Sequence, residues 1–356
     1  MLANWAEGLQ PGSPSKSVGP YAKEEVTTSS SLTRSLQQRL SPLTQGRNQV
    51  SASQARQLAG NRQLHGEDAA LAAVLPEVIE RLDQPLSLAN LGQLEGEERL
   101  ESLFQDRLAR LNTSRELFRG SPEPSLVRQG SESNCVLTST AIALAKQRPQ
   151  ALQSMMAEEG DKIRLQLPKQ AERWVEMPDT WDLLHQSCAY FNGMWMTVLS
   201  KALGPVGSTQ PGEAVQLLTG NKVDGDWLRF KSEGTTRKKI QKALQQQAVV
   251  IAGRSGIDCE VPGLEKNHSF AVLGFDAHND RVRLQDPNGR EPVDAQGRAL
   301  DGEMDGSFAM NLGEFKRSFS TIHYEHPDGG SGWSKKWENL KEALFPSGSG
   351  GTVPTS

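Results

Sequence analysis

The spacing of hydrophobic residues divides the chain into a polar leader, a helical region, a mixed core and a polar tail. Large apolar residues are sparse over residues 1–65, where Ser, Thr, Gln, Gly and Pro predominate, so this segment is predicted to be a disordered leader. Over residues 66–120, apolar residues such as Leu100, Leu103 and Phe104 recur at three- and four-residue spacing, which predicts helices. We expect this helical N-terminal region to pack on the core as a subdomain, with a prosegment or a lid as alternatives.

The spacing of apolar residues over residues 121–222 predicts mainly helices. An apolar, Ala- and Leu-rich helix is expected to begin at Cys135. Residues 162–167 alternate strictly between polar and apolar, which predicts a half-buried strand. Residues 181–203 have a helical pattern that Asn192 and Gly193 interrupt.

Strand patterns dominate residues 235–325. Residues 248–252 are continuously apolar, which predicts a buried strand. Residues 268–275 and 281–286 flank the turn-forming sequence Ala-His-Asn-Asp, so the two segments are predicted to form a β-hairpin.

The polar stretch 221–234 is expected to join two lobes, about 121–222 and about 235–325, of one α+β core. Residues 326–356 form a predicted C-terminal tail that ends in a Gly- and Ser-rich sequence. Trp333 lies in this tail, which could contain a short docking helix. The division into leader, helical region, core and tail is the domain organisation that the pattern favours.

Composition and charge exclude several classes of function. The 356 residues carry a net charge of only −4 without a basic block, so nucleic acid is not an expected partner. Three widely separated cysteines form neither a disulfide framework nor a zinc motif. The chain has no apolar run of transmembrane length and no signal-peptide pattern at residue 1. We expect no membrane span and a protein that is cytoplasmic or exported without a cleavable signal peptide; the sequence does not indicate an oligomeric state.

Candidate chemistry begins with residues 129–135, which read Gln-Gly-Ser-Glu-Ser-Asn-Cys. Cys135 would lie in the first turn of a helix, where unpaired N–H groups and the helix dipole favour thiolate over thiol. Gln129, six residues upstream, could turn back and donate its side-chain amide to a developing oxyanion. The pattern therefore points to a reactive cysteine, although a buried core cysteine is generically the commoner case.

The predicted hairpin supplies a candidate base. His268 lies at the start of its first strand, and Asp286 lies at the end of its second, so the two should be close. Asp286 shares a strand face with Val282 and Leu284, where a carboxylate needs a partner such as an imidazole N–H. Asn288 has the same parity and stays an alternative, but Pro287 tends to end the strand and favours Asp286.

Three segments together resemble the catalytic core of the calpain family of cysteine proteases. They read Gln-Gly-x-x-x-Asn-Cys at 129–135, Gly-Leu-x-Lys-x-His-Ser at 263–269 and Asp-Pro-Asn-Gly at 286–289, and the likeness extends from about Leu126 to Tyr324. The resemblance implies a papain-like α+β fold with a helical lobe carrying the Cys and a β-rich lobe carrying the His and Asp. It also implies a cysteine-type endopeptidase that hydrolyses peptide bonds of protein or peptide substrates through an acyl-enzyme.

By this resemblance each site residue has a role. Cys135 is the nucleophile, His268 the base, Asp286 the residue that orients the base, and Gln129 the oxyanion donor. No cofactor is required for the chemistry. Calcium is a possible activator, because animal members of the family need it, although no EF-hand loop is present.

The chain departs from the family at two positions that wall the cleft. Val136 follows the nucleophile, where the family usually has Trp, and Asn288 replaces the Trp of the Asn-Pro-Trp-Gly sequence. Asp286 replaces the usual Asn of the same sequence and adds a negative charge that favours imidazolium. These changes leave the substrate preference open.

Two other functions are compatible with the same residues. A Cys-His-Asp triad on this fold would also serve a transglutaminase-like acyl transferase or a glutamine deamidase, and a calpain-like interaction protein could have lost activity altogether. His185 and Cys188 could meet one metal ion from adjacent helical turns, but no further ligand is near them in the sequence, so we interpret them as ordinary residues. Cys259 is interpreted as incidental.

Overall fold

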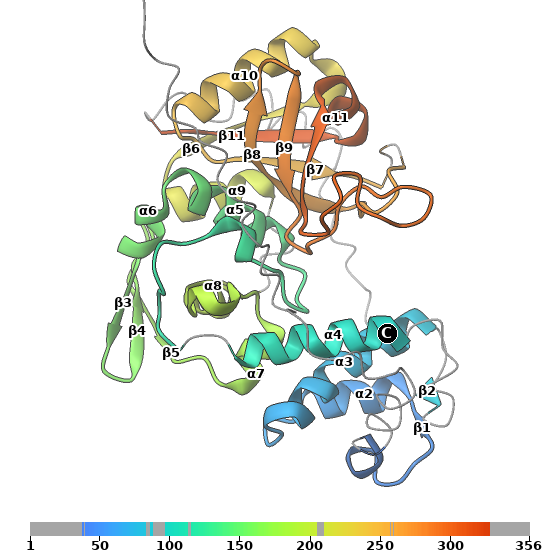
Figure 1. The fold of residues 1–356 in the computed structure, drawn as a ribbon. Helices are drawn as coiled ribbons and strands as arrows, with labels where there is room; N and C mark the ends of the chain where they lie inside the picture. Colours follow the sequence, from blue (N-terminus) through green and yellow to red (C-terminus); the bar gives the residue numbers. More distant parts are fainter. Residues whose placement is uncertain are drawn as a thin grey trace, which may run out of the picture.

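The computed structural model describes residues 38, 40–82, 86–87, 97–112, 115–204, 210–256, 258 and 260–327. Helices and antiparallel sheets coexist in these residues, so the expected α+β class is confirmed. Helices α2–α4 lie at the opposite end of the molecule from the six-stranded sheet, with helix α5 between them (Figure 1).

The N-terminal helices form a unit with its own hydrophobic cluster. This cluster includes Leu40, Val50 and Ala55, all essentially inaccessible to solvent, so the predicted disordered leader is wrong between residues 40 and 65. The prediction failed because few apolar residues lie in this segment, but those few all pack against the apolar helix that follows. Residues 1–37 lie outside the described residues. The elements here are β1 (Gln49–Val50), α2 (Ala52–Ala59), α3 (Gly66–Leu82), β2 (Leu86–Ser87) and α4 (Glu97–Leu111).

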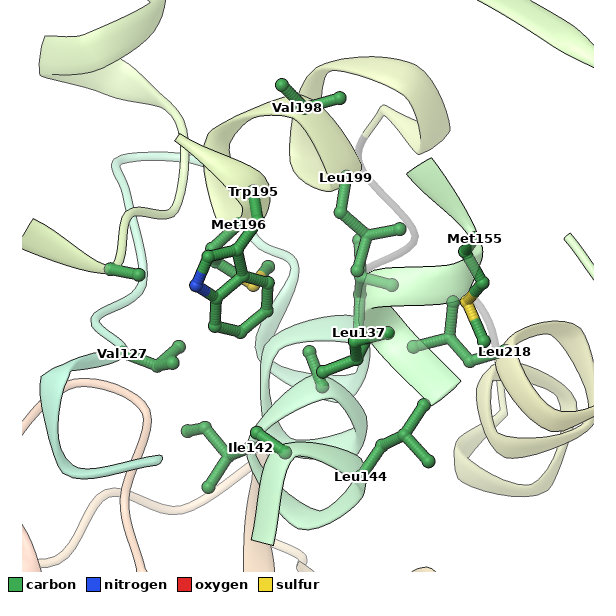
Figure 2. Packing of buried hydrophobic residues seen from close by; sticks show 14 of the residues in the cluster. Val127, Leu137, Ile142, Leu144, Met155, Trp195, Met196, Val198, Leu199 and Leu218 are labelled. Atoms are coloured by element: carbon green, nitrogen blue, oxygen red, sulfur yellow. The ribbon is translucent and has the colours of Figure 1, made fainter. Parts of the chain in front are cut away.

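The helix-rich middle of the chain surrounds α5, whose residues 136–145 are all buried. Figure 2 shows Trp195 and Leu199 of α8 turned toward this helix, which also carries Leu137 and Ile142. The interruption predicted near Asn192 is present, because a turn of 3₁₀ helix separates α7 from α8. The elements are η2 (Pro124–Leu126), α5 (Cys135–Gln147), α6 (Pro149–Ser154), α7 (Thr180–His185), η3 (Tyr190–Asn192), α8 (Trp195–Leu203) and α9 (Pro211–Thr219).

A three-stranded antiparallel sheet flanks these helices. Its central strand, β4, contains the alternating residues predicted as a strand, and Ile163 and Leu165 point into the core. The strands are β3 (Met156–Glu159), β4 (Lys162–Leu165) and β5 (Arg173–Glu176).

The larger sheet has six strands in the order β10-β9-β8-β7-β11-β6, and neighbouring strands are antiparallel. The predicted hairpin is confirmed as β8 and β9, and helices α10 and α11 pack on the sheet through Ile240 and Phe315. The elements are β6 (Lys222–Trp227), η5 (Leu228–Phe230), α10 (Glu233–Gln245), β7 (Val250–Arg254), β8 (His268–Asp276), β9 (Arg281–Gln285), β10 (Ser307–Asn311), α11 (Leu312–Ser318) and β11 (Thr321–His326).

The expected linker at 221–234 is wrong. Its first half is the edge strand β6, which pairs with β11, and its second half begins α10. The strand is hard to recognise because Asp224, Gly225 and Asp226 interrupt any apolar alternation. Asp226 is nevertheless buried, and its carboxylate is paired with Lys239 at 2.7 Å, which compensates the desolvation of the charge.

One hydrophobic cluster joins the helices to the sheet. This cluster contains Leu137 and Ile142 of α5. It also contains Val249, which precedes β7, Ile251 of β7 and Ala271 of β8. The start of α5 is thereby held against the start of β8, which positions the candidate site. None of the described helices is long and apolar enough to span a membrane. Cys259, Trp333 and most of the predicted tail lie outside the described residues.

Candidate active site

Cys135 is the first residue of α5, as the sequence predicts. The preceding residue, Asn134, is completely buried, and its side chain ties the helix start to its surroundings instead of capping the helix. Its amide donates to Ser200 Oγ at 2.9 Å, and its Oδ1 accepts hydrogen bonds from Thr138 at 3.2 Å and Ser187 at 3.1 Å. This buried network fixes the start of α5 and therefore the position of Cys135.

The loop before Cys135 runs closely along another backbone segment. The N–H of Ser131 donates to the carbonyl oxygen of His185 at 2.9 Å. A Cβ atom on Gly130 would lie 2.0 Å from that same oxygen and 2.5 Å from the carbonyl carbon of Gln186. Only glycine fits this close approach, which explains the Gly of the Gln-Gly segment.

His268 and Asp286 are in direct contact. His268 begins β8, is 6% exposed, and its Nε2 lies 2.9 Å from Oδ1 of Asp286, which directly follows β9. The same oxygen accepts the backbone N–H of Asn288 at 2.7 Å. The Asn288 side chain instead donates to Glu265 at 2.9 Å, so between the two candidates it is Asp286 that meets the histidine.

The thiol lies close to the imidazole. Cys135 and His268 are near enough for each to shift the pKa of the other, and Ser269 also contributes to the shift at Cys135. Because Nε2 faces Asp286, Nδ1 is the ring nitrogen left for the thiol. Ser139, one turn after Cys135, donates its hydroxyl to the carbonyl oxygen of Ser269 at 2.8 Å and keeps α5 and β8 in register at this point.

The electrostatics favour charge separation between these side chains. Burial lowers the pKa of His268, but the hydrogen bonds to Asp286 and Cys135 and their charges outweigh it and raise the pKa to about 10. Burial raises the pKa of the Cys135 thiol, but the hydrogen bond and positive charge of His268 bring it below its usual value. Both directions favour a thiolate beside an imidazolium near neutral pH. Oδ2 of Asp286 is buried and has no hydrogen-bond partner among the described residues, so the carboxylate can accept a further hydrogen bond.

The backbone of Gln129 contacts the segment that follows Asp286. Its N–H donates to the carbonyl oxygen of Pro287 at 2.7 Å and so joins the cysteine loop to the segment after Asp286. Its side-chain amide nitrogen donates to the carbonyl oxygen of Glu132 at 3.0 Å. Its Oε1 is buried, and no described residue provides a hydrogen-bond partner for it. The amide would have to turn from Glu132 to reach an oxyanion at Cys135.

A charged cluster on α4 with two buried arginines is not predicted by the sequence. Arg110 donates to the carbonyl oxygens of Gln129 at 2.9 Å and Gln186 at 3.1 Å, and it pairs with Asp106 at 2.8 Å. Arg107 pairs with the same carboxylate at 2.7 Å, and the Tyr190 hydroxyl also donates to it. A four-residue Asp–Arg spacing on a helix normally marks an exposed ion pair, so the sequence carries no signal that this pair is buried and holds the cysteine loop.

A pocket of about 800 Å³ opens next to these residues. Helices α2–α4 form one wall, Gln129, Gly130 and Ser131 form a second, and residues 288–290 form a third; Cys135 and His268 are not among the lining residues. Its charged lining residues are Arg56, Arg107, Arg110, Arg128, Arg290, Glu77 and Asp106.

The described residues contain no group of three or more His, Cys, Asp or Glu side chains placed to hold a metal ion. His185 Nδ1 lies 3.0 Å from the carbonyl oxygen of Trp181, and its ring stacks on that tryptophan. Cys188 is fully buried and exchanges two backbone hydrogen bonds with Arg128. Activation by calcium stays a prediction.

Comparisons with known proteins give no assignment, because no protein-family model and no curated protein matches this chain. The calpain resemblance of the three short segments therefore stays a prediction. The site itself rests on the hydrogen bond between His268 and Asp286 and on the nearness of Cys135 to His268.

Proposed function

We propose that the chain is a papain-like, two-lobed cysteine endopeptidase of the calpain type, acting on protein or peptide substrates. The helix-rich residues would be one lobe and the six-stranded sheet the other. The observation that carries this proposal is the contact of the buried His268 imidazole with the Asp286 carboxylate, close to the Cys135 thiol at the start of α5. Two segments more than a hundred residues apart meet there, as a nucleophile and its base require.

The first half of the reaction follows from this arrangement. His268 holds the proton of Cys135, and the thiolate adds to the carbonyl carbon of the scissile peptide bond. The C–N bond then breaks as the imidazolium gives its proton to the leaving amine, and a thioester with Cys135 remains. Asp286 keeps the ring oriented and stabilises its charge throughout.

The second half returns the enzyme to its starting state. A water molecule adds to the thioester carbonyl while His268 accepts its proton, the C–S bond breaks, and the carboxylic acid product leaves. The oxyanion of each tetrahedral intermediate would be bound by the Cys135 N–H, which is at the first turn of α5, and by the Gln129 amide after it turns from Glu132.

The experiment that tests the proposal is the pH dependence of thiol alkylation. Wild-type protein and the His268→Ala variant are treated with iodoacetamide or E-64, with and without calcium, and the labelled cysteine is identified by mass spectrometry. Cys135 should react below pH 7, and His268→Ala should abolish this reaction. Cys188 is the internal control, since burial raises the pKa of its thiol. A Cys135 that labels no faster than Cys188 would overturn the protease proposal and favour an interaction protein.

A second assay separates the protease from other acyl transfers by the same triad. Peptides from a digested protein mixture are incubated with the enzyme, and new N-termini and free ammonia are both measured. New N-termini without ammonia support the endopeptidase. Ammonia from glutamine residues without chain cleavage would identify a deamidase instead.

A further inference from the structure

The pocket beside the active site has an excess of positive charge. Arg107 and Arg110 share the single carboxylate of Asp106, at 2.7 and 2.8 Å, and Glu77 lies 3.7 Å from Arg107. Tyr190 also donates its hydroxyl to Asp106, so that carboxylate is fully engaged. Asp106 and Glu77 together offset the charges of Arg107 and Arg110, so the excess charge of the pocket lies on the other arginines that line it.

Arg128 adds a charge that no carboxylate of the described residues pairs with. Within that part of the chain, its guanidinium donates only to the backbone carbonyl oxygens of Ser125 and Val127, both at 2.8 Å, and of Asp305 at 2.9 Å. No ion pair within the described part of the chain includes it. These neutral acceptors fix the position of the guanidinium, and Gly289 lies against it, since a Cβ there would be 2.7 Å from Nε. Arg128 is therefore a positioned cation on the wall of the pocket.

The pocket is lined by two segments that lie next to the candidate site in the sequence. Residues 129–131 lie four to six positions before the nucleophile, residues 288–290 follow Asp286, and the hydrogen bond from Gln129 to Pro287 joins these two walls. Met304, which is exposed, and Leu103 add apolar surface at the same pocket. An extended chain with its scissile bond at Cys135 would bring a side chain a few residues away to this pocket, since each residue advances about 3.3 Å.

We infer that this pocket binds the carboxylate of an Asp or Glu side chain of the polypeptide substrate, a few residues from the scissile bond. The inference rests on the proposed function and adds a substrate class to it. Arg128 supplies the charge, and a carboxylate is the planar anion that a guanidinium group binds best. Helices α2–α4 are then part of the substrate site and not a removable prosegment.

The test measures binding without turnover. Two fluorescein-labelled decapeptides, five repeats of Ala-Glu and five repeats of Ala-Gln, are titrated against the Cys135→Ala variant by fluorescence anisotropy. The Glu peptide should bind at least about tenfold tighter at low salt, as expected for hydrogen bonds to a charged group. Equal affinities for the two peptides would overturn the inference.

Amino-acid substitutions test whether the preference for the Glu peptide depends on Arg128. Adding Arg128→Gln should remove most of the preference for Glu, whereas Arg128→Lys, which keeps the charge, should retain part of it. Arg237→Gln is the matched control, because it removes one positive charge on α10, where Arg237 pairs with Asp280. A loss of preference in Arg237→Gln as large as that in Arg128→Gln would mean a general charge effect and would refute the pocket.

A measurement on the unaltered pocket guards against a misfolded Arg128→Gln variant. Raising NaCl from about 0.05 to 0.5 M shortens the screening length severalfold, so the ratio of the two affinities should fall toward one. A ratio that does not change with salt would contradict the inference. Iodoacetamide labelling of Cys135 is scored separately, so an inert thiol would refute the protease while leaving the peptide preference to decide on the pocket.

Discussion

Replacing Asp286 by Asn removes one negative charge from the candidate triad while keeping an oxygen that can accept from the imidazole. Asp286 has no exposed surface, and its Oδ1 is 2.9 Å from Nε2 of His268. The substitution therefore tests whether the charge of this carboxylate, beyond its hydrogen bond, stabilises the imidazolium. If it does, the pKa of His268 should fall from about 10 in Asp286→Asn.

The size of the effect follows from the distance between the charges. Two unit charges about 4 Å apart interact by about 4 kcal/mol at an effective dielectric constant of about 20. Measured effects of one nearby opposite charge are about 1 to 3 pKa units, so we expect the pKa of His268 to fall by about 2. The equilibrium between the thiolate–imidazolium and thiol–imidazole pairs then shifts about 100-fold toward the neutral pair, or about 2.7 kcal/mol.

The assay is the rate of iodoacetamide alkylation of Cys135 between pH 4 and 10, with the His268 ring titrated by NMR. In Asp286→Asn the alkylation at pH 6 should slow by at least about tenfold, because less thiolate is present. Asp280→Asn is the control, since that carboxylate pairs with Arg237 away from the site. An unchanged alkylation profile together with an unchanged His268 titration would refute the reasoning and leave Asp286 a purely steric role.

Three further predictions concern stability, each measured by urea unfolding. Gly130→Ala should lose at least about 3 kcal/mol, because its Cβ would overlap a backbone carbonyl, whereas Gly234→Ala, with open space at its Cβ, should lose nothing; equal effects would contradict this. Arg110→Met should lose about 1 to 3 kcal/mol, because two carbonyl oxygens lose their donor while Asp106 loses one partner and keeps Arg107 and Tyr190; an unchanged stability would mean that α4 does not hold the cysteine loop. The raised pKa of His268 stabilises the fold fully below pH 6.5, and this contribution is lost as the pH rises toward about 10. The lowered pKa of Cys135 contributes above pH 9.0 and is lost as the pH falls, so the two changes oppose each other where these ranges overlap. In Cys135→Ala the opposing contribution of the thiol is absent. The stability of this variant should therefore fall more steeply than that of wild type as the pH rises above 6.5, by at most about 1.4 kcal/mol per pH unit. Parallel stability profiles for the two proteins would contradict the coupling between Cys135 and His268.

The elements nearest the candidate site could be predicted from the sequence because their signals are local. The apolar run after Cys135 marks a buried helix, and the two alternating segments around a turn mark the hairpin that brings Asp286 to His268. The choice of Asp286 over Asn288 also follows from local chemistry, since a proline ends the strand between them.

Features that depend on distant partners could not be predicted. The strand β6 has a polar sequence, and it is a strand because β11 pairs with it and Lys239 neutralises Asp226. Residues 40–65 look disordered because their few apolar side chains gain a core only from α3 and α4. Arg110 resembles a surface residue until its carbonyl partners at Gln129 and Gln186 are known.

The strand order of the large sheet also sets the timing of assembly during synthesis. β11 lies between β7 and β6, so the sheet stays incomplete until residues 321–326 have left the ribosome. At about 5 to 20 residues per second, β6 waits roughly 5 to 20 s for this partner. Cys135 is made long before that point, while the strand that carries its histidine still lacks a complete sheet. A nascent chain would therefore expose the edge of β7, the strand next to β8, until the last strand closes the sheet.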